Sequence, residues 1–220
     1  MKFVIVLSGG MDSGVLLKMW RDVYADAEIH AITFNYGSNH AKKEIAKAKI
    51  LAAKYADKHI VLPLKFISKY FKSSLISGSK AIPDGHYASE NMKSTVVPFR
   101  NGIMLAIAIG YAESIGANKV LIGAHAGDHF IYPDCRPEFI MAMNAASMSG
   151  TFDGITIDAP FKSLSKRDIA VIGEARGMDF RDTYTCYKGR KKHCGVCGSC
   201  TERKEALSGF DPTYYERRKK

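Results

Sequence analysis

The chain has 220 residues, of which 46% are hydrophobic and 25% are charged. These values are typical of a folded globular protein with one large domain, with or without a small appendage, and they exclude a disordered or low-complexity chain. The formal net charge of +10 favours an anionic ligand or a nucleic acid, although basic side chains can also simply be solvated.

The excess charge is concentrated near the end of the chain. Residues 181–220 contain eleven Lys or Arg against five Asp or Glu, so they carry +6 of the total. The longest strongly apolar stretch, residues 103–112, is shorter than the about 20 residues that cross a bilayer. The apolar run of residues 3–7 is shorter than that of a signal peptide. We therefore expect a cytoplasmic protein that does not associate with membranes.

Strand and helix patterns alternate along the chain. Strands are expected at residues 2–7, 28–35, 59–64 and 119–123. Helices are expected at residues 12–21, 41–56, 101–115, 136–146 and 165–176. Residues 65–95 are weakly periodic and should form loops with one short helix. The alternation predicts an α/β fold with a doubly wound, Rossmann-like parallel sheet, in which ligands bind beyond the carboxyl ends of the strands.

Residues 8–13, SGGMDS, connect the first predicted strand to the first predicted helix. The two glycines could simply make a tight turn. They would also let backbone N–H groups approach an anion at the start of the helix. The loop lacks the Walker lysine and the G-x-G-x-x-G pattern, which excludes a P-loop NTPase and a dinucleotide fold. Asp12 suits such a loop if it caps the helix or helps to hold Mg²⁺.

This motif after a buried strand resembles the pyrophosphate loop of the PP-loop ATP pyrophosphatases, the adenine nucleotide alpha-hydrolase-like superfamily. The resemblance implies that ATP binds here with Mg²⁺ and is cleaved between its α and β phosphates. The residues that it assigns to the nucleotide are Leu7, Ser8, Gly9, Gly10, Met11, Asp12, Ser13, Gly14, Val15, Leu16 and Leu17. Met11 and Gly14 depart from the pattern, which has a polar residue and Thr at these positions.

Four of the five cysteines form one cluster, Cys186, Cys194, Cys197 and Cys200, with the spacing C-x7-C-x2-C-x2-C. Disulfides are disfavoured in a reducing cytosol, and a redox pair would not need four thiols. Four thiolates fit one tetrahedral structural Zn²⁺, and an iron–sulfur cluster is the alternative. We expect His193 to be solvated and the fifth cysteine, Cys135, to be a small packing residue. The chain is accordingly divided into a nucleotide-binding domain, residues 1–180, and a zinc-binding segment, residues 181–220, packed on it.

Other polar side chains gather where ligands of such a sheet would bind. Arg100 and Asn101 begin a predicted helix, which Asn101 could cap. The loop after the fourth predicted strand, GAHAGDHFIYPDCR, could recognise a ligand by hydrogen bonds through His125, Asp128, His129, Tyr132, Asp134 and Arg136. A catalytic metal at His125 and His129 is a weaker interpretation. Near the last predicted helix, Lys166 is placed to reach a phosphate, Lys162 precedes it, and Ser165 with Asp168 predicts a capping box.

These pieces in this order are similar to the 7-cyano-7-deazaguanine (preQ0) synthases of the PP-loop superfamily. The similarity covers residues 7–203, apart from residues 65–95, through FNYG, VPFRN, GDHFIYPDCRPEF, APFKSLSK and TCYKGRKKHCGVCGSC. It implies a homodimeric ligase of queuosine biosynthesis that converts 7-carboxy-7-deazaguanine and ammonia to the nitrile with ATP, through an adenylated acid and an amide. Since no glutaminase-like domain is recognisable, ammonia would come from solution or from a partner.

The resemblance also implies roles for individual residues. Those expected to be catalytic are Asp12, Arg100, Asp128, Asp134 and Lys166. Arg100 and Lys166 would offset phosphate or carboxylate charge, whereas Asp128 and Asp134 would serve the guanine-like edge, Mg²⁺ or the ammonia. Those expected to bind substrate are Arg100, Asn101, His125, Asp128, His129, Tyr132, Asp134 and Arg136.

His125 and His129 stand where the family pattern has an amide or small residues, which leaves open a relative that stops at the amide. A tRNA-modifying PP-loop enzyme of the thiolase or lysidine synthetase type is favoured by the net charge. Two features argue against this alternative. The cysteines form a single cluster, whereas such an enzyme would have a separated catalytic pair, and no RNA-binding appendage is recognisable. A non-catalytic zinc-knuckle protein that binds nucleic acid would leave the glycine loop unexplained. We do not expect a nucleic acid to be the direct substrate.

Overall fold

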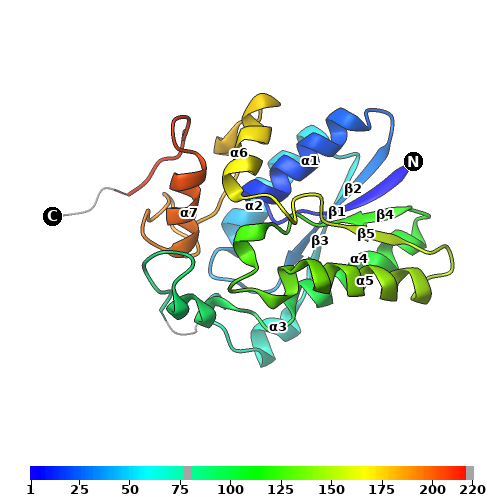
Figure 1. Ribbon diagram of the computed structural model, residues 1–220, viewed down its shortest axis with the longest axis horizontal. Helices are drawn as coiled ribbons and strands as arrows, with labels where there is room; N and C mark the ends of the chain where they lie inside the picture. Colours follow the sequence, from blue (N-terminus) through cyan, green and yellow to red (C-terminus); the bar gives the residue numbers. More distant parts are fainter. Residues whose placement is uncertain (77–80, 217–220) are drawn as a thin grey trace.

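The computed structural model describes residues 1–76 and 81–216, and these contain one five-stranded sheet in which all the strands are parallel (Figure 1). The strands are β1 (Lys2–Val6), β2 (Glu28–Asn35), β3 (Lys58–Pro63), β4 (Lys119–Leu121) and β5 (Thr156–Asp158). Their order is β3-β2-β1-β4-β5. The predicted doubly wound α/β sheet is therefore confirmed, with β5 as an additional edge strand.

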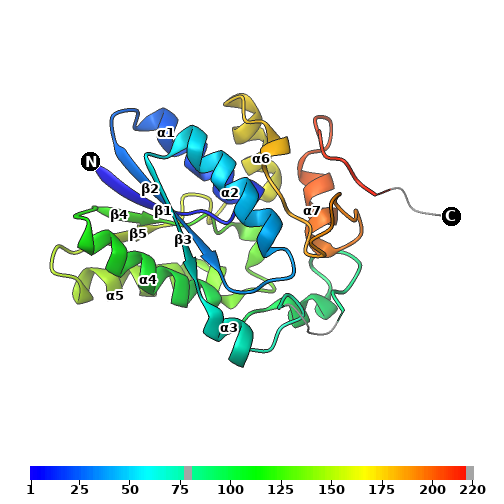
Figure 2. The ribbon, with the colours of Figure 1, turned by 180° about the vertical axis from the view of Figure 1, so that it is seen from behind.

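Helices cover both faces of the sheet (Figures 1 and 2). One face carries α1 (Met11–Val23), α2 (Ala41–Tyr55) and α6 (Lys166–Ala175), and the other carries α4 (Arg100–Ser114) and α5 (Pro137–Gly150). Because successive side chains of a strand point to opposite faces, Phe3 and Ile5 of β1 join the core under α1, while Val4 and Val6 join the core under α4. Side chains of the same short apolar strand therefore contribute to both cores.

The remaining helices are short. They are α3 (Lys65–Tyr70), α7 (Gly198–Ala206) and the 3₁₀ helices η1 (Glu90–Thr95), η2 (Ala126–Asp128), η3 (Pro133–Cys135) and η4 (Phe180–Asp182). The predicted capping box of α6 is confirmed, because Ser165 Oγ accepts a hydrogen bond from the Asp168 N–H and Asp168 Oδ2 accepts one from the Ser165 N–H. Helix α5 runs four residues beyond its predicted end, to Gly150.

Among the residues that the structure describes, one stretch is apolar enough and long enough to cross a membrane by composition alone, Glu90–Ser114, with a mean hydropathy of 1.3 over its most apolar window. In the structure it comprises η1, a turn at Phe99 with φ 50°, and α4. Buried residues make up 44% of that window, and α4 contacts β1 and β4. Core helices pass the same test, so the composition is weak evidence for a membrane span.

Part of the segment 181–216 packs on the α1 face. Ala206 and Leu207 are buried in the same core as α1 and α6, and the Tyr184 N–H donates a hydrogen bond of 2.9 Å to the Gly9 carbonyl. The hydrophobic core therefore crosses the predicted boundary at residue 180. The division into two units stays a prediction.

Candidate active site

A cavity opens where the order of the strands reverses, beyond the carboxyl ends of β1 and β4. Such a switch point is where open α/β sheets bind their ligands. The predicted site residues that line the cavity are Leu7, Ser8, Gly10, Met11, Asp12, Ser13, Arg100, Asn101, Asp128, Tyr132 and Lys166. Segments far apart in the sequence therefore contribute to one cavity.

Some predicted site residues do not line this cavity: Gly9, Gly14, Val15, Leu16, Leu17, His125, His129, Asp134 and Arg136. The Val15, Leu16 and Leu17 side chains are fully buried in the core between α1 and the sheet. Arg136 is exposed, and its Nε donates a hydrogen bond to the His129 carbonyl at 3.0 Å. Of the predicted loop 123–136, the structure thus brings Gly123, Ala124, Asp128, Tyr132 and Cys135 to the cavity.

The loop of residues 8–13 is shaped by close backbone contacts. Gly9 has φ +86°, and a Cβ there would lie 2.2 Å from the Glu44 carbonyl oxygen of α2. The Ser8 N–H donates to Ser13 Oγ at 3.1 Å, and the Gly10 N–H donates to Ser8 Oγ at 3.1 Å. The first N–H groups of α1 have no partner within the helix. The loop can therefore present backbone and hydroxyl donors to phosphates.

Gly14 explains one departure from the superfamily pattern. A Cβ at this position would lie 2.8 Å from Met178 Cε and 3.0 Å from Leu51 Cδ1. A threonine here would require the ends of the Met178 and Leu51 side chains to move, so the packing of α1 in this chain favours glycine. The departure lies on the core side of the helix and away from the cavity.

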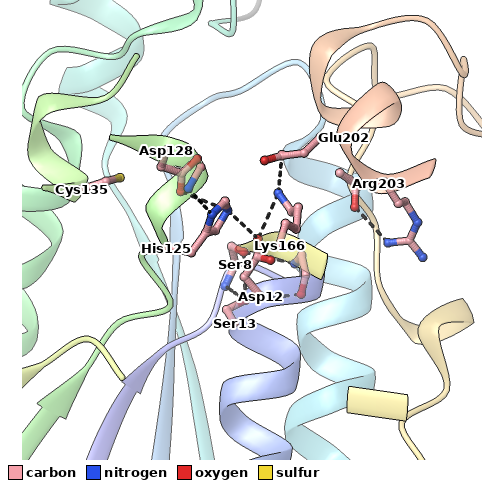
Figure 3. Close-up of polar contacts among 12 residues, drawn as sticks. Ser8, Asp12, Ser13, His125, Asp128, Cys135, Lys166, Glu202 and Arg203 are labelled. Carbon is pink, nitrogen blue, oxygen red and sulfur yellow. Dashed lines mark hydrogen bonds and ion pairs between the residues drawn. The ribbon is translucent and has the colours of Figure 1, made fainter. Parts of the chain in front are cut away.

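Charged side chains converge next to this loop (Figure 3). Lys166 Nζ lies 3.3 Å from Asp12 Oδ2 and 2.6 Å from Glu202 Oε2. Burial disfavours a charged Lys166, but the nearby carboxylates of Asp12, Glu202 and Asp128 outweigh this effect and raise its pKa. Lys166 therefore stays protonated beside the loop, as a residue that meets phosphate charge must. Glu202 was not predicted, because the sequence TERKE is typical of a solvated helix face.

His125 is fully buried beneath the same cluster. Its Nδ1 accepts a hydrogen bond from the Gly127 N–H at 3.1 Å, which places the hydrogen of the neutral ring on Nε2. Nε2 lies 3.4 Å from Asp128 Oδ2 and 3.8 Å from Asp12 Oδ2 (Figure 3). His125 thus contacts carboxylates that line the cavity and is itself behind them.

The carboxylate of Asp12 has chemistry that suits Mg²⁺. Its Oδ1 is buried and has no hydrogen-bond partner among the described residues, which is costly for a charged oxygen unless a cation or water completes it. Mg²⁺ prefers carboxylate, phosphate and water oxygens. Asp12 therefore fits a metal that bridges it to a nucleotide.

A second set of contacts fixes the start of α4. Asp134 Oδ2 accepts a hydrogen bond of 2.8 Å from the Asn101 N–H, so Asp134 caps this helix. Asn101 Nδ2 donates to the Asp134 carbonyl and to Cys135 Sγ. The prediction that Asn101 caps the helix is wrong, because Phe99 is the N-cap and Asn101 lies inside the helix. Cys135 is buried, as predicted, but it also lines the cavity.

Arg100 projects from α4 toward the opposite wall. Its Nη1 donates to Tyr36 Oη at 3.1 Å, and its guanidinium lies 5.5 Å from the centre of that ring. His40 and Glu44 of the same wall also line the cavity, with His40 Nε2 3.3 Å from Glu44 Oε2. Burial raises the pKa of Glu44. Among these residues only Arg100 was predicted. Tyr36 lies within the quoted FNYG but was not singled out. His40 and Glu44 carry no sequence signal that separates them from surface residues.

The four clustered cysteines form a compact metal-type site. Their sulfur atoms all lie within 4.8 Å of one another and all four residues are buried. Within residues 1–76 and 81–216 no other group of three or more potential ligands is as close. Four sulfurs match structural Zn²⁺ and leave no open position for a substrate.

His193 does not behave as predicted. It is only 7% exposed, and its Nε2 accepts a hydrogen bond from the Thr185 N–H at 3.2 Å. Burial lowers its pKa to about 4, so the ring is neutral at pH 7. The expectation of a solvated His193 is therefore wrong: the ring supports the segment between α6 and the cysteine cluster.

The comparisons with known proteins agree with this geometry. The family model described as "Queuosine biosynthesis protein QueC" matches residues 2–211. The chain belongs to this family. It is 54% identical over 215 residues to the 7-cyano-7-deazaguanine synthase of Desulfotalea psychrophila, covering 96% of this chain and 97% of the relative. It is 50% identical to that of Porphyromonas gingivalis, covering 97% and 96% of the two chains. The resemblance noted in the sequence is thus confirmed.

Solved structures share the fold at low identity. The U34-tRNA thiolase NcsA of Methanococcus maripaludis has a TM-score of 0.52 at 14% identity, with 86% of this chain and 62% of that chain covered. The NH3-dependent NAD synthetase of Campylobacter jejuni has a TM-score of 0.50 at 15% identity, with 82% and 66% covered. Identities this low show a common architecture and say nothing about the substrate.

Proposed function

We propose that the chain is an ATP-dependent 7-cyano-7-deazaguanine synthase of queuosine biosynthesis, a ligase that forms carbon–nitrogen bonds. One observation carries the proposal: a glycine loop suited to phosphates shares its cavity with Arg100, Asp128 and Lys166, in a chain 54% identical to a 7-cyano-7-deazaguanine synthase.

The reaction needs activation of a poor electrophile. An oxygen of the 7-carboxylate attacks the α-phosphorus of ATP and pyrophosphate leaves, which gives an acyl adenylate. The nitrogen of ammonia attacks the acyl carbon, AMP leaves, and a proton is lost to give the amide. A second ATP activates the amide oxygen in the same way, and loss of AMP with the remaining nitrogen protons gives the nitrile. Positioning and charge stabilisation account for most of the catalysis in such steps.

The residues of the cavity suit these steps. The N–H groups and hydroxyls of residues 8–13 would hold the departing pyrophosphate, and Lys166, protonated and 10% exposed, would offset its charge. Arg100 would hold the carboxylate or a phosphate from the opposite wall. Asp12 with Asp128 would hold Mg²⁺, which supplies charge neutralisation between the phosphates when bound.

A structural Zn²⁺ held by Cys186, Cys194, Cys197 and Cys200 completes the proposal. Its contribution would be to folding, where such sites supply about 10–16 kcal/mol in zinc-finger peptides. We further propose a cytoplasmic homodimer that takes ammonia from solution or from a partner and does not act directly on nucleic acid. The family membership supports these points.

The test is direct. Purified protein is mixed with Mg-ATP, ammonium and 7-carboxy-7-deazaguanine, and pyrophosphate release and product mass are measured. Nitrile formation is expected; accumulation of the amide would support a relative that stops there, and turnover only with tRNA would support the thiolase type. Lys166→Ala should lower turnover at least about 100-fold because a group next to the transferred charge is lost. Lys162→Ala, which removes a lysine whose side chain is 43% exposed, is the matched control and should retain activity.

A further inference from the structure

Three carboxylates line the cavity, those of Asp12, Glu44 and Asp128, and Glu44 stands apart from the other two. Asp12 and Asp128 both lie close to His125 Nε2, at 3.8 and 3.4 Å, and belong to the charged cluster that faces the phosphates. Glu44 is on α2, and in the described part of the chain its one ion-pair partner is His40. Phosphate and Mg²⁺ binding therefore do not account for Glu44.

The Glu44 carboxylate is held from one side and accessible from the other. Its Oε2 lies 3.3 Å from His40 Nε2. His40 Nδ1 donates a hydrogen bond of 3.2 Å to the Tyr187 carbonyl oxygen, which fixes the imidazole ring. The Glu44 side chain is 19% exposed where it lines the cavity. No donor other than His40 contacts it within residues 1–76 and 81–216, so the carboxylate can accept further hydrogen bonds from a ligand.

Aromatic side chains lie beside this carboxylate. Tyr36 and Tyr187 both line the cavity, and the Tyr187 ring is 5.5 Å from that of His40. Burial raises the pKa of Tyr36, and the nearby charge of Glu44 adds to this effect. Aromatic rings pack favourably against planar heterocycles. This wall therefore suits a flat ring with hydrogen-bond donors at its edge better than it suits a phosphate.

The proposed reaction has two heterocycles, and a carboxylate distinguishes them. Ionised carboxylate oxygens only accept hydrogen bonds. The 7-deazaguanine ring has two adjacent donors, the N1–H and the 2-amino group, which match the two oxygens of a carboxylate. The adenine of ATP instead has its amino donor next to N1, an acceptor that a carboxylate repels. Glu44 thus matches the deazaguanine edge and does not match adenine.

We propose that Glu44 determines the specificity for the 7-deazaguanine ring, with its carboxylate accepting hydrogen bonds from the N1–H and the 2-amino group. This role rests on the proposed function, because that reaction takes 7-carboxy-7-deazaguanine as its substrate. The resemblance offered Asp128 and Asp134 for the same edge. Asp134, however, accepts the Asn101 N–H and does not line the cavity, and Asp128 lies in the charged cluster.

Ionisation of Glu44 and binding of the ring support each other. Burial raises the pKa of Glu44, and the positive charges of His40 and Arg100 oppose this rise. Two N–H donors from the ring would stabilise the charged carboxylate further, since hydrogen bonds to the charged form favour it. A ring without these donors would leave the carboxylate unpaired in the closed site, which is costly.

The main experiment compares Glu44→Gln with Glu138→Gln. Each variant removes one negative charge from the first turn of a helix, but Glu138 is exposed and does not line the cavity. In Glu44→Gln the Kd and the KM for 7-carboxy-7-deazaguanine should rise at least about tenfold, because hydrogen bonds to a charged group are lost. The KM for ATP should stay within about twofold of that of the unsubstituted protein. Glu138→Gln should leave all three constants unchanged.

A second substrate tests the same contact and does not depend on the folding of a variant. 7-Carboxy-7-deazahypoxanthine lacks the 2-amino group and keeps the carboxylate that reacts. The unsubstituted protein should use it with a kcat/KM at least about tenfold lower, because Glu44 would lose one donor. In Glu44→Gln this preference should shrink at least about threefold, since the two changes remove the same contact. Glu138→Gln should keep the full preference.

Pyrophosphate release and binding of the acid, measured by calorimetry, separate the two proposals. If the unsubstituted protein releases no pyrophosphate with the acid, Mg-ATP and ammonium, the proposed function fails, and the Kd for the acid still tests Glu44. An unchanged Kd and KM for the acid in Glu44→Gln would overturn the role of Glu44. A rise in the KM for ATP alone would also overturn it, since Glu44 would then bind the nucleotide. Equal use of the two acids by the unsubstituted protein would overturn it without any variant.

Discussion

At the scale of single residues, the position of the loop of residues 8–13, here called the phosphate loop, depends on Gly9, which has no side chain. Gly9 combines a positive φ of +86° with a close approach of the loop to the backbone of α2. A residue with a Cβ would be strained at this φ, and its Cβ would lie 2.2 Å from the Glu44 carbonyl oxygen. Gly9 therefore fixes the position of the loop against α2.

Gly9→Ala should lower the free energy of unfolding by more than about 3 kcal/mol, since it adds a backbone clash to the roughly 1–2 kcal/mol cost of the left-handed conformation. Gly116→Ala is the matched control, because Gly116 has φ +64° with nothing within 4 Å of an added Cβ. It should cost about 1–2 kcal/mol alone. Urea denaturation of the two variants measures the difference, and equal losses would show that the contact with α2 can relax.

At the scale of elements, the start of α4 is fixed by the 3₁₀ helix η3. Asp134 accepts the Asn101 N–H, and this places Arg100, one residue earlier, at the cavity. The contact gives Asp134 a structural role in addition to, or in place of, the catalytic role that the resemblance implies. The two roles predict different effects of substitutions at Asp134.

Asp134→Ala should lower the free energy of unfolding by about 1–2 kcal/mol, which is the usual cost of losing a helix cap. Asp134→Asn keeps an oxygen acceptor and should lose less stability, with turnover reduced less than about tenfold. Asp153→Ala, at an exposed acidic residue, should have no effect on either quantity. Denaturation and pyrophosphate release are measured side by side. A stably folded Asp134→Asn without turnover would instead support direct action on the substrate.

The elements that could be predicted are those with a local signal. β1, β2 and α2 have clear apolar patterns, and residues 8–13 form a contiguous motif, so their places were foreseen. β5 was missed because its three residues are too few to show a period. α7 was missed because it begins with Gly198 and Ser199 and buries two charged residues, Glu202 and Arg203, where an apolar stripe would be expected.

The lack of a local sequence signal also limits prediction of the site. Glu202 enters the charged cluster only because the segment after residue 180 folds back over α1 and α6, and no pattern near Glu202 encodes that path. His125 could be singled out as a polar residue after a strand, but its position behind Asp12 and Asp128 depends on the turn at Gly127. The positions of these side chains therefore depend on long-range packing and could not be predicted from the local sequence.

At the scale of the whole molecule, the cysteine cluster and the phosphate loop are linked by one short segment. Tyr184 donates to the Gly9 carbonyl, and Cys186 is two residues further along the chain. Arg203, 1% exposed, donates to Thr183 Oγ1, Thr185 Oγ1 and the Phe180 carbonyl. A metal held by the cysteines would therefore stabilise one wall of the cavity from a distance.

Removal of that metal should loosen the wall and leave the sheet intact. After chelation, or in Cys197→Ser, zinc content and soluble yield should fall together, because a structural site of this kind contributes folding energy. Amide hydrogen exchange should accelerate in residues 181–216 and in the phosphate loop, whereas β1, β2 and β4 should keep their protection, since buried strands open last. Cys135→Ser is the control, because this thiol is outside the cluster, and it should retain zinc. Normal protection without metal would mean that the four sulfurs hold no structural ion, and loss of protection throughout would mean that the sheet depends on the C-terminal segment for its own stability.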